Sequence, residues 1–259
     1  MSKSLERAND NWNALKNPFF WFLISSYAKT NLFSKDHISK LKIRQNDNPI
    51  IQSLLQRIES IYQTFEKQYD TWQFASRRYA GYTFAMQELL NELRSTKIRR
   101  WDILVQVAYD VNTREYYELL PENRKPFQNG SIDNRILTVK QFANNLAIFP
   151  ELVDLQTQVT DFYQSMEKLR DEQNQHEQNV RNASNLLKEA QLNLLDELFY
   201  NLSNLLALYY KDTSVVTGFF QMDIVRNSTT NNGEVEEEFQ EVLEPILPNE
   251  ETQEEEAAE

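Results

Sequence analysis

The fold class follows from one stretch of the chain, residues 51–93, which reads IQSLLQRIESIYQTFEKQYDTWQFASRRYAGYTFAMQELLNEL. Its large apolar and aromatic residues recur at alternating steps of four and three residues. This heptad pattern is typical of a helix that packs along its length on another helix. The positions in the pattern are Ile51, Leu55, Ile58, Tyr62, Phe65, Tyr69, Trp72, Ser76, Tyr79, Thr83, Met86, Leu90 and Leu93.

The heptad pattern shifts by one residue after Leu93 and resumes at Ile98 and Trp101. No Pro or Gly lies at the shift, which therefore indicates a local stutter within one helix and not a loop. The sequence predicts a first long helix over residues 49–110. Pro49 suits the first turn of this helix, because the N–H group that proline lacks would have no partner there.

A second heptad pattern begins after Pro150 and continues to Tyr209. A constant shift of 101 residues lays it on the first pattern without a gap, so that YQTFEK at 62–67 meets YQSMEK at 163–168. Because polar residues match as well as apolar ones, we predict an internal duplication. The second long helix and a C-terminal cap are expected over residues 150–226.

The connector, residues 111–149, contains a Pro- and Gly-rich turn and a short helix. It is too short to run back along a helix of about 90 Å, so the long helices should be antiparallel. The predicted fold is all-α, an elongated antiparallel helical bundle or coiled coil of two long, repeat-related helices with short helices at the ends. A competing interpretation breaks each long helix near Gly81 and Asn182 and gives a compact four-helix bundle.

The ends of the chain differ from its middle. Residues 1–48 are expected to form short helices that pack on the bundle, one of them over 19–33. Residues 227–259 are expected to be a disordered acidic tail. Residues 234–259 contain twelve Glu and no Lys or Arg, which accounts for the whole net charge of −12. The rest of the chain is close to neutral and lacks the basic excess of a nucleic-acid-binding protein.

Composition argues against several functional classes. Cysteine is absent and only four glycines occur, so no thiol chemistry and no phosphate-binding glycine loop are expected. Neither His37 nor His176 follows a Glu at the spacing of a di-iron motif. We expect no catalytic residue, no cofactor and no metal. The absence of a signal peptide and of a membrane span predicts a cytoplasmic protein.

Two segments are candidates for binding a partner. The turn-rich loop offers Arg124 and Phe127, for which packing within the fold is the competing explanation. An apolar island in the acidic tail offers Phe239, Leu243 and Ile246, a composition that suits a peptide docking in a groove.

Part of the chain resembles a known family. The segments KIRRWD at 97–102, LLPENRKPFQNG at 119–130 and LFYNL at 198–202 carry the resemblance, together with Arg135-Ile136, Asp212 and Phe219-Phe220. They are similar to an uncharacterised all-helical bacterial family found mainly in Bacteroidota. The resemblance spans about residues 62–226 and implies a helical fold without implying an activity.

The sequence thus favours a non-enzymatic structural or protein-interaction protein whose partner is another protein or a second copy of itself. Nucleic acid is not expected as a partner, and a membrane is not favoured. The alternative is a membrane-apposed or membrane-active helical protein that uses residues 19–33, where Phe19 to Ile24 form an apolar cluster. A helical-bundle enzyme whose site the sequence does not reveal is the third hypothesis.

Overall fold

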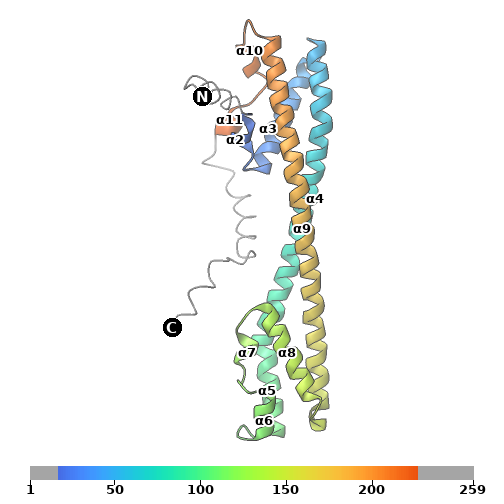
Figure 1. Cartoon of the computed structure of the whole chain (residues 1–259), viewed down its shortest axis with the longest axis vertical. Helices are drawn as coiled ribbons and strands as arrows, with labels where there is room; N and C mark the ends of the chain where they lie inside the picture. Colours follow the sequence, from blue (N-terminus) through green and yellow to red (C-terminus); the bar gives the residue numbers. More distant parts are fainter. Residues whose placement is uncertain (1–16, 227–259) are drawn as a thin grey trace, which may run out of the picture. The chain divides into compact units, whose positions relative to one another are not determined.

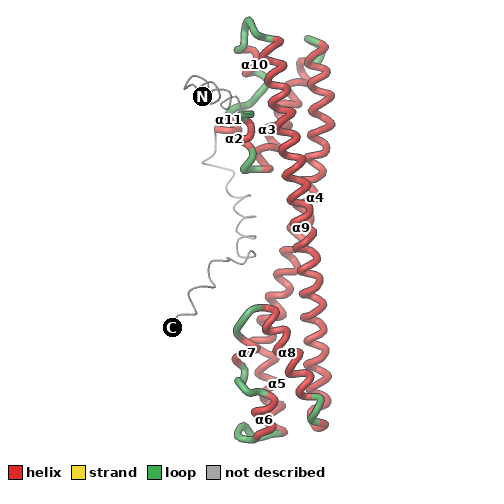
Figure 2. Tube along the Cα trace, in the orientation of Figure 1, coloured by secondary structure: helices red, strands yellow, loops and turns green. Residues whose placement is uncertain are grey.

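The computed structural model describes residues 17–226, which are all-α and contain no strand in that range (Figures 1 and 2). Its elements in chain order are α2 (Phe19–Leu23), α3 (Tyr27–Arg44), α4 (Pro49–Glu92), the π-helix η1 (Leu93–Lys97), α5 (Ile98–Ala108), α6 (Arg114–Leu119), α7 (Lys125–Gln128), α8 (Ile132–Leu146), the 3-10 helix η2 (Pro150–Leu152), α9 (Val153–Leu208), α10 (Ser214–Thr217) and α11 (Asp223–Arg226).

Two long helical runs dominate the fold. α4, η1 and α5 follow one another directly as a run of 60 residues, and η2 with α9 forms a second run of 59 residues. The two runs pack antiparallel, which confirms the predicted all-α class and the antiparallel pairing. α4 continues through Gly81 and α9 through Asn182, so the interpretation with breaks at these residues is wrong. The internal duplication stays a prediction.

The chain divides into two compact units. Unit 1 comprises Met1–Gln73 and Ala183–Glu259, and unit 2 comprises Phe74–Asn182. The boundaries fall within α4 and α9, so each unit contains one part of each long helix.

Unit 1 packs the first part of α4 and the last part of α9 with α2, α3, α10 and α11 (Figure 1). The heptad residues Ile51, Ile58 and Phe65 are completely buried in its core. The predicted helix over 19–33 is wrong, because the structure has two helices there. α3 begins anew at Tyr27, where the hydroxyl of Ser26 accepts a hydrogen bond from the backbone N–H of Lys29 and caps the helix.

Unit 2 packs the rest of α4, η1 and α5 with α6, α7, α8, η2 and the first part of α9. η1 gives the physical reason for the shifted heptad pattern. A π-turn holds one residue more than an α-turn, so Ile98 lies on the same face as Leu93 although the two are five positions apart. Both side chains are completely buried. The predicted stutter is therefore a π-turn within an unbroken helical run.

The connector is held by local signals. The hydroxyl of Ser131 accepts a hydrogen bond from the N–H of Asn134 and caps α8. Gly130, just before this cap, has a φ of +96°, a conformation that favours glycine. Asn123 has a φ of +53°, which asparagine tolerates better than most residues. These residues bring α7 against α8 and η1.

Candidate functional site

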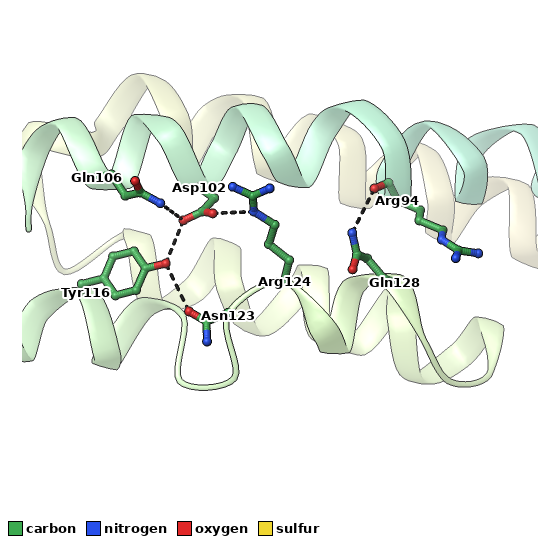
Figure 3. Close-up of polar contacts among 7 residues, drawn as sticks. All are labelled: Arg94, Asp102, Gln106, Tyr116, Asn123, Arg124 and Gln128. Atoms are coloured by element: carbon green, nitrogen blue, oxygen red, sulfur yellow. Dashed lines mark hydrogen bonds and ion pairs between the residues drawn. The ribbon is translucent and has the colours of Figure 1, made fainter. Parts of the chain in front are cut away.

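A buried carboxylate organises the short helices of unit 2 (Figure 3). Asp102 on α5 is only 3% exposed. Its Oδ1 accepts hydrogen bonds from Nε2 of Gln106 and from the hydroxyl of Tyr116, each 2.9 Å long. Its Oδ2 accepts a 2.5 Å bond from Nε of Arg124. The Tyr116 hydroxyl also lies 3.4 Å from Oδ1 of Asn123. One carboxylate thus holds α6 and the start of α7 against α5.

Electrostatics favour the ionised form of Asp102. Burial acts to raise the pKa of this carboxyl, but the hydrogen bonds from Gln106, Arg124 and Tyr116 lower the pKa more, so that it lies below its usual value. Burial, followed by the bond to Asp102, raises the pKa of Tyr116. Because three donors already occupy the carboxylate, it suits the fixing of a loop better than the removal of a proton from a substrate.

The structure gives the two residues predicted in the loop different partners within unit 2. Arg124 forms the ion pair with Asp102. Phe127 is 3% exposed and packs edge-on against the ring of Phe142, at 5.5 Å between ring centroids. Both side chains therefore take part in the packing of unit 2. An interaction role for them stays a prediction.

The opposite side of α5 is unoccupied among the described residues. Val107 is 81% exposed and Ile103 is 56% exposed. Ile103 follows Arg99 by four residues and Arg100 by three, and Val107 follows Ile103 by four, so the four residues share one face of the helix. Trp101 is 1% exposed on the core side. The sequence run Arg99-Arg100-Trp101 is therefore divided between two faces. A nucleic-acid-binding surface would need the indole of Trp101 to stack on a base, but this side chain is buried.

Sequence reasoning missed this face, which we call the α5 outer face and define as Arg99, Arg100, Ile103 and Val107. The signal was present in the helical periodicity. Once Ile98 and Trp101 are assigned to the core, rotation of about 100° per residue places the outer face opposite them. No ion pair of Arg99 or Arg100 occurs among residues 17–226.

Unit 2 contains a polar cluster around His176, between its two long helices. Gln173 is 4% exposed and donates a 3.0 Å hydrogen bond from Nε2 to the hydroxyl of Thr83. Its Oε1 accepts a 2.8 Å bond from Arg170. His176 is half-buried and stacks on Tyr82, with 4.4 Å between ring centroids. These groups pair the two long helices to each other.

Unit 1 contains a second buried polar cluster, around His37. Nδ1 of His37 lies 2.9 Å from the backbone oxygen of Phe219, which can only accept, so Nδ1 carries the proton. Nε2 then accepts a 3.0 Å bond from Nδ2 of Asn201. The imidazole stacks on Phe220, with 4.3 Å between ring centroids. Burial lowers the pKa of His37 to about 4, although the Phe219 bond and the charge of Asp36 oppose that shift. The histidine is therefore neutral near pH 7.

Unit 1 also has an open groove of about 520 Å³ between α4 and α9. Arg57 crosses it and donates two hydrogen bonds of 2.9 Å to the carboxylate of Glu197. Its guanidinium also lies over the ring of Tyr200, 4.2 Å from the centroid. Glu197 is 5% exposed, so, like Asp102, it is an acidic residue that lies in the interior and not on a solvent face. Arg57, which crosses the groove, is thus already paired with Glu197.

The tail residues Phe239, Leu243 and Ile246 lie outside the described residues. Within residues 17–226 no three acidic or histidine side chains gather in a way that could hold a metal ion. In the same range no helix is long and apolar enough to cross a membrane. Comparison with protein-family models, with curated proteins and with solved structures found no match to the chain. The resemblance to a bacterial helical family therefore stays a prediction.

Proposed function

We propose that this chain is a non-enzymatic interaction protein that binds a partner protein through the α5 outer face. The observation that carries the proposal is the pair Ile103 and Val107, two exposed aliphatic side chains one helical turn apart. Single exposed apolar residues are normal on protein surfaces, whereas neighbouring ones suggest a contact surface. Phe74 and Phe84 on α4 are also exposed, but ten residues, or about 15 Å of helix rise, separate them, so they form no continuous patch.

The charges of the face define the partner. Arg99 and Arg100 lie at one end of the apolar pair and are exposed. A partner that presents apolar side chains flanked by carboxylates would bury Ile103 and Val107 and would pair the guanidinium groups. Aliphatic burial supplies most of the affinity in such an interface, and the charges supply association rate and selectivity.

The Asp102 cluster gives the face its rigidity. Asp102 and Gln106 occupy the flank of α5 between the core side and the outer face. Gln106 donates to Asp102 within α5, and Asp102 ties this helix to α6 and to the start of α7. A surface that is already ordered loses little conformational entropy when a partner binds. We therefore assign Asp102 and Arg124 to the support of the binding surface, and not to direct contact.

The alternative functions have weaker support. Membrane apposition through residues 19–24 would rest on Trp21, Phe22 and Ile24 alone, because Phe19 and Leu23 lie in the core of unit 1. For an enzyme, the charged groups in the buried clusters and in the groove would have to be available to a substrate. Instead they are engaged with one another.

The test begins with a photo-crosslinking residue at position 107 of the full chain in cells, and with the same residue at position 43 as control. Ile43 on α3 is 80% exposed and belongs to unit 1. A protein captured only from position 107 is then purified, and its dissociation constant for the full chain is measured.

The proposal predicts that I103E/V107E weakens the affinity at least about 100-fold, which corresponds to about 2.7 kcal/mol. R99E/R100E should weaken it about 10-fold and reduce its dependence on salt. I43E should have no effect. Equal weakening by I43E, or unchanged affinity of I103E/V107E, would refute the assignment. If the captured protein is this chain itself, the face is a self-association surface and the acidic partner is refuted.

A further inference from the structure

α2 exposes an aromatic surface in unit 1 that no described residue covers. Trp21 is 76% exposed, Phe22 is 46% exposed and Ile24 is 44% exposed. We call these three residues the α2 patch. Large apolar side chains grouped so closely generally mark a contact surface.

Contacts on the buried side of α2 fix its position. Phe19 packs against Phe33 and Phe220, at 5.5 and 5.7 Å between ring centroids. The backbone oxygen of Leu23 accepts hydrogen bonds of 3.0 Å from the hydroxyl of Thr30 and from Nε2 of Gln191. α2 is thus held on both α3 and α9 while the α2 patch faces outward.

The last described residues of the chain belong to the same unit as α2. Phe220, which touches Phe19, precedes Arg226, the last described residue, by only six positions. α11 packs on α3, as α2 does. The 33 residues beyond Arg226 therefore continue from a helix that packs on α3, as α2 does, in the same unit.

Those 33 residues contain an apolar segment of suitable size. Phe239, Leu243 and Ile246 lie in the segment FQEVLEPIL, residues 239–247. Phe239 follows Arg226 by 13 residues, a linker whose root-mean-square span is about 20 Å when it is flexible. Such a short tether raises the local concentration of the segment to about the millimolar range, so even a weak contact would be largely formed.

Charge also favours residues 239–247 as the segment that covers the α2 patch. Lys35, Lys40 and Lys42 on α3 have acidic partners. Lys29, in the first turn of α3 and next to α2, forms no ion pair among the described residues. It is available to the glutamates around the tail segment. Within residues 17–226, one lysine of α3 without an ion pair is, in contrast, a poor anchor for an anionic membrane.

We propose that residues 239–247 dock in cis on the α2 patch, with Phe239, Leu243 and Ile246 against Trp21, Phe22 and Ile24. The tail then acts as a built-in cover of this surface and competes with any outside ligand for it. This inference is independent of the α5 outer face, which belongs to unit 2.

The test labels the full chain with 5-fluorotryptophan and follows the ¹⁹F resonance of Trp21, assigned with W21F. The readout is the change of its shift between H₂O and D₂O, which reports solvent exposure. We compare the wild type with F239S/L243S/I246S and with V235S, a matched tail control outside the apolar segment. Samples at several protein concentrations separate contact within one chain from contact between chains.

The proposal expects Trp21 to be shielded in the wild type and in V235S at every concentration, and to gain the solvent shift of an open indole in F239S/L243S/I246S. An exposed Trp21 in the wild type would overturn it. Shielding that survives the triple substitution would also overturn it and would identify another occupant, such as residues 1–16. Shielding that appears only at high concentration would indicate a second copy.

A vesicle-binding experiment tests whether a membrane can cover the α2 patch in place of the tail. Vesicles of phosphatidylcholine and phosphatidylglycerol are added to the wild type and to the triple variant. If the tail covers the patch, the wild type should bind vesicles at least several-fold more weakly than the triple variant. Equal and strong binding of both would show that the tail does not protect the patch, and would contradict the proposal.

Discussion

The two units hold their short helices with different chemistry. In unit 1 a neutral imidazole, His37, binds the backbone of Phe219 and stacks on Phe220, and so fixes the segment that carries α10 and α11. In unit 2 an ionised carboxylate, Asp102, binds Tyr116 and Arg124 and so fixes α6 and α7. The difference teaches that one architecture of paired long helices accepts either an uncharged or an ionic anchor, each with its own sensitivity to pH.

The long helix is a regular α-helix around Thr71 in unit 1, whereas in unit 2 it contains the π-turn η1. Deletion of one residue at each of these places should give the largest difference in stability. Thr71 and Ser95 are both exposed, and each hydroxyl bonds the carbonyl four residues earlier. Removing Thr71 from regular α4 rotates the following heptad residues by about 100° and should cost more than about 4 kcal/mol. Removing Ser95 converts the π-turn to an α-turn and keeps Leu93 and Ile98 on one face.

The Ser95 deletion should therefore cost less than about 1 kcal/mol. Urea denaturation, monitored by circular dichroism, measures the loss in the free energy of unfolding for both deletions. Equal losses for the two deletions would show that the π-turn does not absorb the extra residue.

The next largest effect should come from Asp102→Ala. The substitution leaves the buried hydroxyl of Tyr116 and the more exposed donors of Gln106 and Arg124 without their acceptor. Because Arg124 can still reach water, we expect a loss of about 3 kcal/mol in the free energy of unfolding, and not the full cost of a stranded buried charge. D161A, which removes an exposed carboxylate from α9, should change stability by less than about 0.5 kcal/mol. Similar losses in both variants would argue against a special role of Asp102.

These residues also show where sequence reasoning succeeds and fails. The heptad residues were predictable because their period alone reveals the buried face, and the π-turn was visible as a one-residue phase shift. Asp102 was missed because aspartate is usually exposed and because two of its partners, Tyr116 and Arg124, lie 14 and 22 positions later. The contact of His37 with Phe219 spans 182 positions, so no local pattern signals it.

Unit 1 should respond to mild acid. The pKa of His37 is about 4 in the folded chain and about 6.5 when unfolded, so below pH 6.5 the unfolded state binds a proton that the folded state does not. The free energy of unfolding should fall as the pH falls through this window, by up to about 3 kcal/mol. Denaturation midpoints from pH 7.5 to 4.5 measure it.

The anchor of unit 2 should respond only at lower pH. The pKa of Asp102 lies below its ordinary value, so its stabilising contribution is complete above about pH 4 and is lost as the pH falls further. H37F should abolish the decline between pH 6.5 and 4, whereas H176Q should keep it. A decline that persists in H37F would assign the effect to other groups.

The smallest effect should come from Arg124→Lys. Lysine keeps the positive charge near Asp102 but offers a single ammonium in place of the guanidinium whose Nε makes the 2.5 Å bond. We expect a loss of about 1 kcal/mol in urea denaturation. A loss as large as that of D102A would mean that geometry, and not charge, dominates the pair.

Hydrogen exchange read by mass spectrometry tests most directly the claim that each buried anchor holds the short helices of its own unit. The full chain is compared with H37F and D102A at pH 7. H37F should speed exchange over residues 214–226 and leave 114–128 unchanged, and D102A should do the reverse. Faster exchange of both segments in either variant, or of neither segment in both variants, would contradict the account.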